Sequence, residues 1–163
     1  MTDRIVYRPI GIIHSPYKTL EDMPIQPAGA KGTEGLIIVR PEFSKGLRDI
    51  EGFSHLYILY HFHRVKEIRL EVTPFLDSKS HGVFATRAPV RPNPVGLSVV
   101  RLLGRVDNEL RIVNVDVLDG TPLLDIKPYV PEFDVFRTDS IGWLEHSSKA
   151  AAHHRSDDRF SRS

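Results

Sequence analysis

Residues 84–98 read FATRAPVRPNPVGLS and place two arginines, an asparagine and three prolines just before an apolar stretch. Arg91 and Asn93 each precede a proline, which fixes its own φ angle and pushes the preceding residue out of the helical region. Both are therefore expected to be extended and to point to a similar side. Gly96 permits close backbone approach. The segment suits a ligand cradle built with Arg87, and the alternative is a rigid crossover whose arginines pair with acidic residues.

A second polar group lies in VDVLDGTPLLDIKPYVP, residues 115–131, where a predicted strand ends. Its members are three carboxylates, a hydroxyl and an amine: Asp116, Asp119, Asp125, Thr121 and Lys127. Carboxylates at a strand end can accept hydrogen bonds from a sugar or an amine, or can act as general bases. The alternative is an ordinary Asp-Gly turn followed by a strand that contains proline.

Histidines in FSHLYILYHFHR, residues 53–64, form a third group. His61 and His63 share a face of a predicted strand, a spacing that occurs in metal sites. No third ligand stands nearby in the sequence, so we expect these histidines to pack or to hydrogen-bond. The adjacent His153 and His154 lie in a polar tail, and we expect no metal there.

The composition is that of an ordinary globular domain, with 163 residues, 40% hydrophobic and 26% charged. The absence of cysteine excludes disulfides, thiolate metal sites and thiol catalysis. No run of eighteen apolar residues and no signal peptide is present, so we expect a cytoplasmic protein with no membrane association. The net charge of +1 argues neither for nor against nucleic acid. Local clusters of basic residues do occur, at Arg64, Lys66, Arg69, Arg87, Arg91, Arg101, Arg105 and Arg111.

Short stretches rich in β-branched and aromatic residues predict a strand-rich domain, either a sandwich or a barrel. The predicted strands are residues 5–15, 35–40, 55–62, 68–75, 82–87, 97–106 and 110–118. Residues 106–110 predict a tight hairpin turn, residues 41–52 predict a short helical segment, and residues 16–34 form a long connection. Alternation over 110–118 places Val113, Val115 and Val117 on the core face, with Ile112, Asn114 and Asp116 opposite.

These segments together resemble the TrmO/TsaA-like family of S-adenosylmethionine-dependent tRNA methyltransferases. The blocks that carry the resemblance are PIGIIHSPYK (9–18), GLRDIEGFSHLYILYHFHR (46–64), HGVFATRAPVRPNPVGLSVVRLLG (81–104) and VDVLDGTPLLDIKPYVP (115–131). The resemblance covers about residues 8–143. It agrees with the absence of a G-x-G-x-x-G motif, because this family does not hold its cofactor in a Rossmann fold.

The resemblance implies a mainly β fold, a single closed β-barrel with short helical segments, working as a homodimer with the cofactor near the subunit boundary. It implies a methyltransferase domain over residues 1–145, followed by a mobile polar tail over 146–163. The implied reaction uses S-adenosyl-L-methionine and no metal to methylate N6 of N6-threonylcarbamoyladenosine at position 37 of a tRNA. The alternatives are another RNA or small-molecule substrate, or a module that binds S-adenosylmethionine or RNA without turnover.

The resemblance also implies roles for individual residues. The cofactor would be held by Gln26, Pro27, Ala28, His63, Arg64, Arg87, Leu97, Val115, Asp116, Asp119, Gly120 and Thr121. Asp116, Asp119 and Asp125 are candidate proton acceptors on their proximity in the sequence alone, and we expect positioning of the substrate to matter more, because no residue is an obvious base held by a second orienting group. Asn93 is assigned to the shape of the site or to a substrate contact. Arg91 and Lys127 are the candidate substrate contacts. Many family members carry a basic residue where this chain has Ile25.

Overall fold

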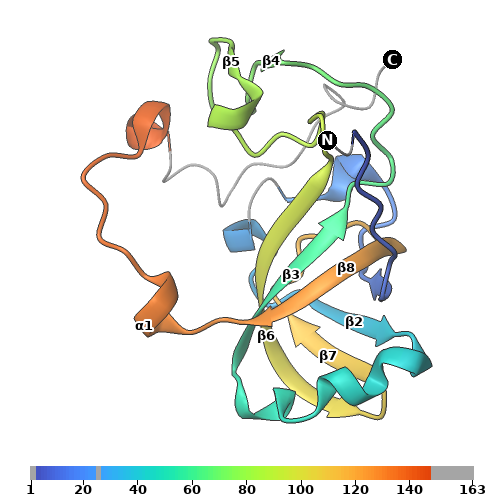
Figure 1. The fold of residues 1–163 in the computed structure, drawn as a ribbon. Helices are drawn as coiled ribbons and strands as arrows, with labels where there is room; N and C mark the ends of the chain where they lie inside the picture. The colour runs from blue at the N-terminus through green and yellow to red at the C-terminus, as the bar shows by residue number, and fades with distance from the viewer. Residues whose placement is uncertain (1–2, 25–26, 148–163) are drawn as a thin grey trace.

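A computed structural model of the protein describes residues 3–24 and 27–147. Six antiparallel strands form a closed barrel in the order β1-β2-β7-β6-β3-β8 (Figure 1). Their bounds are Gly11–His14 (β1), Glu34–Val39 (β2), His55–His61 (β3), Val95–Val106 (β6), Glu109–Val113 (β7) and Thr121–Pro128 (β8). The expected closed β-barrel is confirmed.

Alternation along the strands fills the barrel. On β3, Leu56, Ile58 and Tyr60 are buried, whereas the residues between them are partly exposed. Apolar side chains inside a closed sheet escape water on every side, which is the main stabilising contribution to such a fold. The barrel core comprises Ile13, Ile37, Val39, Leu47, Leu56, Ile58, Tyr60, Val100, Leu102, Leu110, Ile112, Val115, Val117 and Leu123.

Two connections seal the ends of this core. The loop of residues 114–120, between β7 and β8, contributes Val115 and Val117, which are 0% and 1% exposed. The opposite end receives Leu47 from a 3₁₀ helix, Pro41–Leu47 (η3), which a second short 3₁₀ helix, Ile50–Gly52 (η4), follows. The short helical segment expected over 41–52 is therefore confirmed.

The hairpin turn expected between residues 106 and 110 is confirmed, with Asp107 at a positive φ of 53°. The expected alternation over 110–118 is wrong in its first half. Strand β7 ends at Val113, and Ile112 rather than Val113 points into the core. Asn114 has a φ of 68°, and this left-handed residue reverses the phase so that Val115 is again buried.

The strands expected at 68–75 and 82–87 are mostly wrong. Only Glu71–Val72 (β4) and His81–Gly82 (β5) pair, as a two-stranded sheet outside the barrel, and a 3₁₀ helix, Val83–Ala85 (η5), follows β5. Val72, Val83, Ala88 and Val90 give this lobe a small core of its own. Prolines such as Pro74 remove the backbone donors that longer strands would need.

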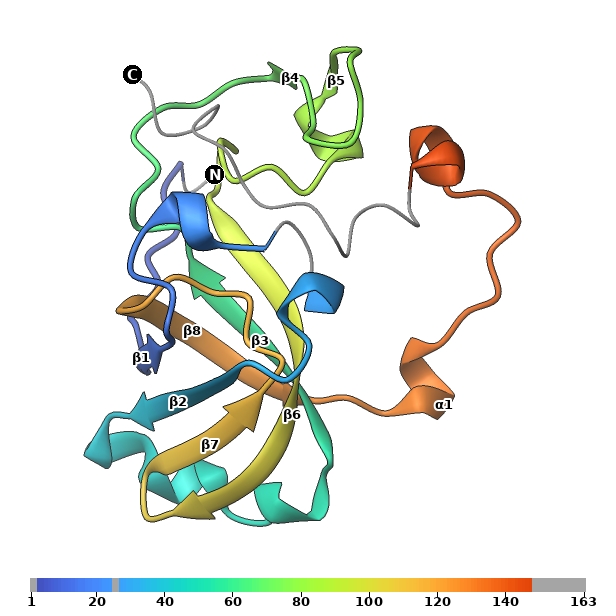
Figure 2. The ribbon, with the colours of Figure 1, turned by 180° about the vertical axis from the view of Figure 1, so that it is seen from behind.

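The remaining elements are short. The connection over 16–34 contains two 3₁₀ helices, Leu20–Asp22 (η1) and Pro27–Ala30 (η2). After β8 the chain forms an α-helical turn, Pro131–Asp134 (α1), and a 3₁₀ helix, Gly142–His146 (η6). Residues 131–146, called the arm here, stand away from the barrel in both views (Figures 1 and 2). None of the described helices is long and apolar enough to cross a membrane. Gln26, His153, His154 and residues 148–163 lie outside the described residues.

Candidate functional site

Segments that the sequence singled out meet at one end of the barrel. The 114–120 loop contacts the chain after η2, because Val115 N donates to Thr33 O at 3.2 Å and Gly32 N donates to Asn114 Oδ1 at 2.9 Å. The end of β3 contacts the proline-rich segment through Phe62 N and Pro94 O, 2.8 Å apart. Figure 2 shows η2 in front of β6 at this end.

Asp116 is the carboxylate at the centre of this region. Ser98 Oγ donates to Asp116 Oδ1 at 2.7 Å. Burial raises the pKa of Asp116, while the Ser98 hydrogen bond and the nearby Arg87 guanidinium act in the opposite direction. The structure therefore brings together two residues of the predicted site, Arg87 and Asp116, from motifs about thirty residues apart.

Two hydroxyls that sequence reasoning missed belong to the same group. Ser98 is 2% exposed and Tyr60 is 6% exposed, and their hydroxyl oxygens lie 2.9 Å apart. Burial, followed by the charge of Asp116, raises the pKa of Tyr60 far above its usual range. The available signal was a polar side chain at a core-facing position of each strand.

The close backbone approach expected at Gly96 is confirmed, and the approaching group is the protein's own Tyr60 ring. A Cβ atom at Gly96 would lie 2.2 Å from Cε2 of Tyr60, so the space above this glycine is filled by the protein's own aromatic ring. The glycine admits the Tyr60 ring to the barrel interior and is not a backbone surface for a ligand.

Leu97 and Lys127 face the outside of the barrel. Leu97 is 57% exposed, and its partner across the sheet, Leu59, also pairs with Asp125. Lys127 Nζ lies 2.8 Å from Asp125 Oδ2, and this contact raises the pKa of Lys127. Leu97 therefore points away from its neighbour Ser98, which faces the interior.

Asp119 belongs to a separate cluster. It accepts hydrogen bonds from Lys18 Nζ at 2.7 Å, from Ser15 N at 3.0 Å and from the His14 ring at 3.1 Å. The Lys18 contact is the main cause that lowers the pKa of Asp119 to about 2. A carboxylate that is so stabilised in its charged form is a weak proton acceptor.

Arg91 is built into the lobe that carries η5. Its Nη1 donates to three backbone carbonyls, those of Val83, Thr86 and Ala88, at 3.1, 2.9 and 3.2 Å. The guanidinium carbon also lies 5.8 Å from the centre of the Phe84 ring. Arg91 thereby fixes the backbone on both sides of Arg87, whereas Asn93 is exposed beside it.

The remaining predicted cofactor residues lie around the same end. Burial and the neighbouring Arg64 lower the pKa of His63, so its imidazole is neutral near pH 7. Gly120 has a φ of 77°, and the Thr121 hydroxyl donates to Leu118 O at 2.6 Å. The backbone of Pro27 and Ala28 forms the first half of η2. Among the described residues, no three histidine, aspartate or glutamate side chains gather as a metal site would require.

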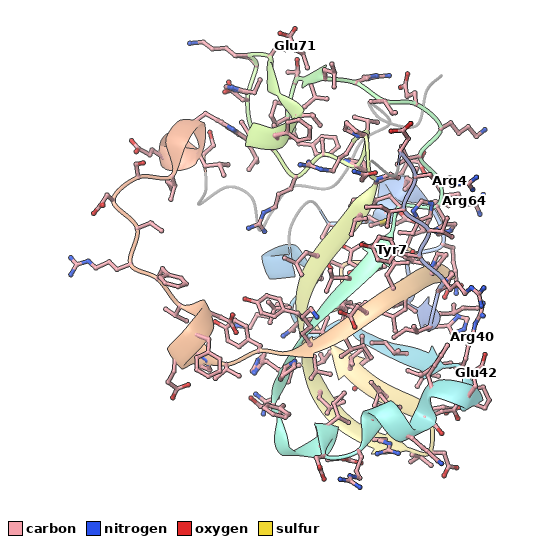
Figure 3. All side chains as sticks on the ribbon, in the orientation of Figure 1. Arg4, Tyr7, Arg40, Glu42, Arg64 and Glu71 are labelled. Atoms are coloured by element: carbon pink, nitrogen blue, oxygen red, sulfur yellow. The ribbon has the colours of Figure 1, made fainter. Side chains whose placement is uncertain are left out.

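Arginines and an exposed tyrosine lie along one edge of the molecule, together with Glu42 next to Arg40 (Figure 3). Figure 3 shows Arg4, Tyr7, Arg40 and Arg64 along the same side of the molecule. All four are exposed, Tyr7 to 74%. Arginines attract phosphates, and exposed aromatic rings can stack on unpaired bases, so this edge is suited to RNA.

Known proteins share this sequence and fold. A family model described as the tRNA-methyltransferase O N-terminal domain matches residues 12–135. A probable S-adenosyl-L-methionine-binding protein of Pyrococcus abyssi is 61% identical over 156 residues, which cover 96% of this chain and 85% of the relative. The tRNA (adenine(37)-N6)-methyltransferase of Escherichia coli is 41% identical over 135 residues, 77% of this chain and 57% of the relative. A crystal structure of TrmO from P. aeruginosa aligns with a TM-score of 0.73 at 36% identity, covering 88% of this chain and 63% of that one.

Proposed function

The chain belongs to the tRNA-methyltransferase O family, and from this premise we propose that it uses S-adenosylmethionine to methylate a tRNA. The proposed target is N6 of N6-threonylcarbamoyladenosine at position 37, in the cytoplasm. The observation that carries the proposal is the Asp116 carboxylate at the end of the barrel, which accepts a 2.7 Å hydrogen bond from Ser98 and lies within electrostatic reach of the exposed Arg87 guanidinium. A cation and a carboxylate in one partly buried site suit a ligand that carries charges of both signs.

The residues present fit such a ligand. The Arg87 guanidinium is exposed and is suited to the carboxylate of the methionine moiety. The backbones of η2 and of the 114–120 loop supply hydrogen-bonding groups nearby, and the neutral His63 ring offers an uncharged partner. S-adenosylmethionine supplies an electrophilic methyl group, which leaves as the electron pair of its C–S bond moves to sulfur.

The protein's own part in the reaction is to position the acceptor nitrogen and to take its proton. The target nitrogen is conjugated to adenine and to a carbonyl, so it is a weak nucleophile. Asp116 is the proposed proton acceptor: the N6–H proton passes to its carboxylate as the N6–CH₃ bond forms. A base is most effective when its pKa approaches the working pH, and burial moves the pKa of Asp116 in that direction.

The other predicted residues have different roles in this proposal. Asp119 is proposed to shape the cofactor pocket and not to accept the proton, because three donors hold it in its charged form. Arg91 is proposed to act through the Arg87 loop and Asn93 to shape the site, whereas Lys127 remains a proposed contact to the RNA.

A homodimer is part of this proposal. The arm exposes three large apolar side chains, Phe133, Val135 and Phe136, to 73%, 62% and 78%. Contiguous exposed apolar groups favour a protein interface, and a second copy of the chain is the partner that we propose. Sedimentation of the wild type as a dimer, and of a Phe133→Asp, Phe136→Asp variant as a folded monomer, would support it. A monomeric wild type would contradict it.

The first test is calorimetric titration with S-adenosylmethionine. Arg87→Ala should weaken binding about tenfold or more, because a charge-assisted hydrogen bond contributes about 1.5–3 kcal/mol. The matched control is Arg101→Ala, an exposed arginine on β6 opposite His55. Equal binding by both variants would remove Arg87 from the site.

The second test is methyl transfer to tRNA with and without the threonylcarbamoyl group, read by mass spectrometry of the nucleosides. Methylation of the modified tRNA alone supports the full proposal. Methylation of another RNA would retain the enzyme and replace the substrate. Binding without any transfer would favour a binding module, which is also what the name of the P. abyssi relative describes for that protein.

A further inference from the structure

Three side chains from three parts of the chain form a line of hydrogen bonds, which we call the relay. Tyr60 comes from β3, Ser98 from β6 and Asp116 from the 114–120 loop. The Tyr60 hydroxyl lies 2.9 Å from Ser98 Oγ, and Ser98 Oγ lies 2.7 Å from Asp116 Oδ1. The relay therefore connects the barrel interior with the carboxylate of the proposed site.

The direction of the relay follows from proton counting. An ionised carboxylate can only accept, so Ser98 donates its one proton to Asp116. Ser98 then has only lone pairs to offer to Tyr60, and the Tyr60 O–H must be the donor of the other bond. The Tyr60 proton therefore points to Ser98 and the Ser98 proton to Asp116, and each hydrogen bond polarises the next.

The relay is held rigidly. Tyr60 and Ser98 are 6% and 2% exposed. The Tyr60 ring lies against Gly96 and meets the Phe62 ring edge-on, with centroids 5.5 Å apart and an interplanar angle of 83°. Neither hydroxyl can turn to water, so Asp116 Oδ1 has a fixed partner.

Stability alone does not explain why the buried positions 60 and 98 carry hydroxyl groups. A phenylalanine and an alanine would fill similar space in the core, and replacing both partners of a buried hydrogen bond by apolar groups is often nearly neutral. The barrel instead has one buried hydroxyl that donates to the Asp116 carboxylate and a second buried hydroxyl that donates to the first. This arrangement fits a carboxylate whose orientation matters.

We propose that Tyr60 and Ser98 are positioning residues, which hold Oδ1 of Asp116 so that its second oxygen receives the substrate proton. The proposal rests on the proposed function and deepens it. Ser98 acts directly on Asp116, whereas Tyr60 acts only through Ser98. Removal of either hydroxyl should leave the cofactor contacts of Arg87 intact.

The variants are Tyr60→Phe, Ser98→Ala and the double variant, with Tyr57→Phe as the matched control on the outer face of the same strand. The first readout needs no turnover. Carbon-13 NMR of labelled aspartate carboxyls follows the titration of Asp116, assigned by loss of its signal in Asp116→Asn. Ser98→Ala should raise the pKa of Asp116 by about one to two units, because the charged form loses a charge-assisted hydrogen bond of about 1.5–3 kcal/mol. Tyr60→Phe should raise it by less, and Tyr57→Phe should not change it.

The second readout is kcat as a function of pH, together with the Kd for S-adenosylmethionine. We expect kcat to fall about 10- to 100-fold in Ser98→Ala and about 3- to 10-fold in Tyr60→Phe, less than the roughly 10²- to 10⁴-fold that a general base itself contributes, because Asp116 is still present in both variants. The acidic limb should move to higher pH, and the cofactor Kd should stay within about twofold. Because Tyr60 acts through Ser98, the double variant should match Ser98→Ala.

The outcomes separate the two proposals. An active wild type with an unchanged Asp116 titration in Ser98→Ala, or with additive effects in the double variant, overturns the relay and leaves the proposed function standing. A wild type that binds S-adenosylmethionine but methylates no RNA overturns the proposed function, and the relay proposal falls with it. Near-UV circular dichroism of Tyr60→Phe, which keeps its ring, checks that the barrel is folded.

Discussion

The ring of Tyr60 occupies the space directly above Gly96, where a Cβ atom would lie 2.2 Å from Cε2 and 2.4 Å from Cζ. The two residues pair across β3 and β6, one carrying a large buried side chain and the other none. A side chain at position 96 and an aromatic ring at position 60 therefore exclude one another. The relay depends on this glycine although the glycine takes no part in it.

Gly96→Ala should destabilise the protein by about 1–3 kcal/mol, the usual cost of overpacking a core. The Tyr60 ring would have to turn, and its hydroxyl would lose the hydrogen bond to Ser98. Urea denaturation gives the change in the free energy of unfolding. Gly104→Ala on the same strand is the matched control, because a Cβ there would meet nothing within 4 Å. Equal free energies of unfolding for the two variants would show that the Tyr60 ring moves aside without an energetic cost.

Lys18→Met should make stability less dependent on pH. The folded-state pKa of Asp119 is about 2, against an ordinary value of 3.8, so its contribution is present above pH 4 and is lost as the pH falls toward 2. Lys18 is 66% exposed, so its removal should cost less than about 1 kcal/mol at pH 7. The difference in the free energy of unfolding between Lys18→Met and the wild type, measured by urea denaturation, should shrink between pH 4 and pH 2. A difference that stays constant in this range, or that persists in an Asp119→Asn background, would contradict the ion pair.

Arg91→Met should loosen the backbone around Arg87, because three carbonyls lose their shared donor. Hydrogen exchange should accelerate in residues 83–90, and the free energy of unfolding should fall by about 1–2 kcal/mol. Binding of S-adenosylmethionine should weaken as well, since Arg87 lies within the loosened segment. Unchanged exchange with a loss of tRNA binding alone would instead assign Arg91 to the RNA.

His81→Ala should release the end of the arm from the β4–β5 lobe. The Trp143 ring stacks on His81, with centroids 4.9 Å apart and an interplanar angle of 17°, and its Nε1 donates to Ala85 O at 2.8 Å. Trp143 is the protein's only tryptophan, so its emission reports on this contact. The emission maximum should move to longer wavelength, whereas His55→Ala, a histidine beside Tyr129, should leave it unchanged. No shift in His81→Ala would mean that the Ala85 bond alone holds the arm.

The barrel was predictable because its strands are short stretches rich in β-branched and aromatic residues, and on β3 buried and partly exposed residues alternate along the whole strand. The burial of Val115 and Val117 after β7 was predicted correctly, but the phase of β7 itself was not, because Ile112 and not Val113 faces the core. The change of phase occurs at Asn114, which has a positive φ and whose side chain accepts a hydrogen bond from the Gly32 amide, 82 residues away in sequence.

The candidate site also contains residues that could be predicted from the sequence and residues that could not. Arg87 and Asp116 could be proposed from the sequence because charged side chains in unusual motifs are conspicuous. Tyr60 and Ser98 could not, because a tyrosine and a serine on the inward face of apolar strands are read as part of the core. The close approach at Gly96 could be predicted, but the sequence does not show whether a ligand or a neighbouring ring fills the space beside a glycine.

Closure of the barrel has a consequence for how the chain is made. Strand β1 is synthesised first, and it pairs on one side with β2 and on the other with β8, which ends at Pro128. A hairpin of β1 and β2 can form early, but its free edge has no partner until nearly the whole domain has left the ribosome. Until then the exposed edge of β1 is a template for pairing with other nascent chains. The nascent protein should therefore need protection from aggregation for almost the full time of its translation.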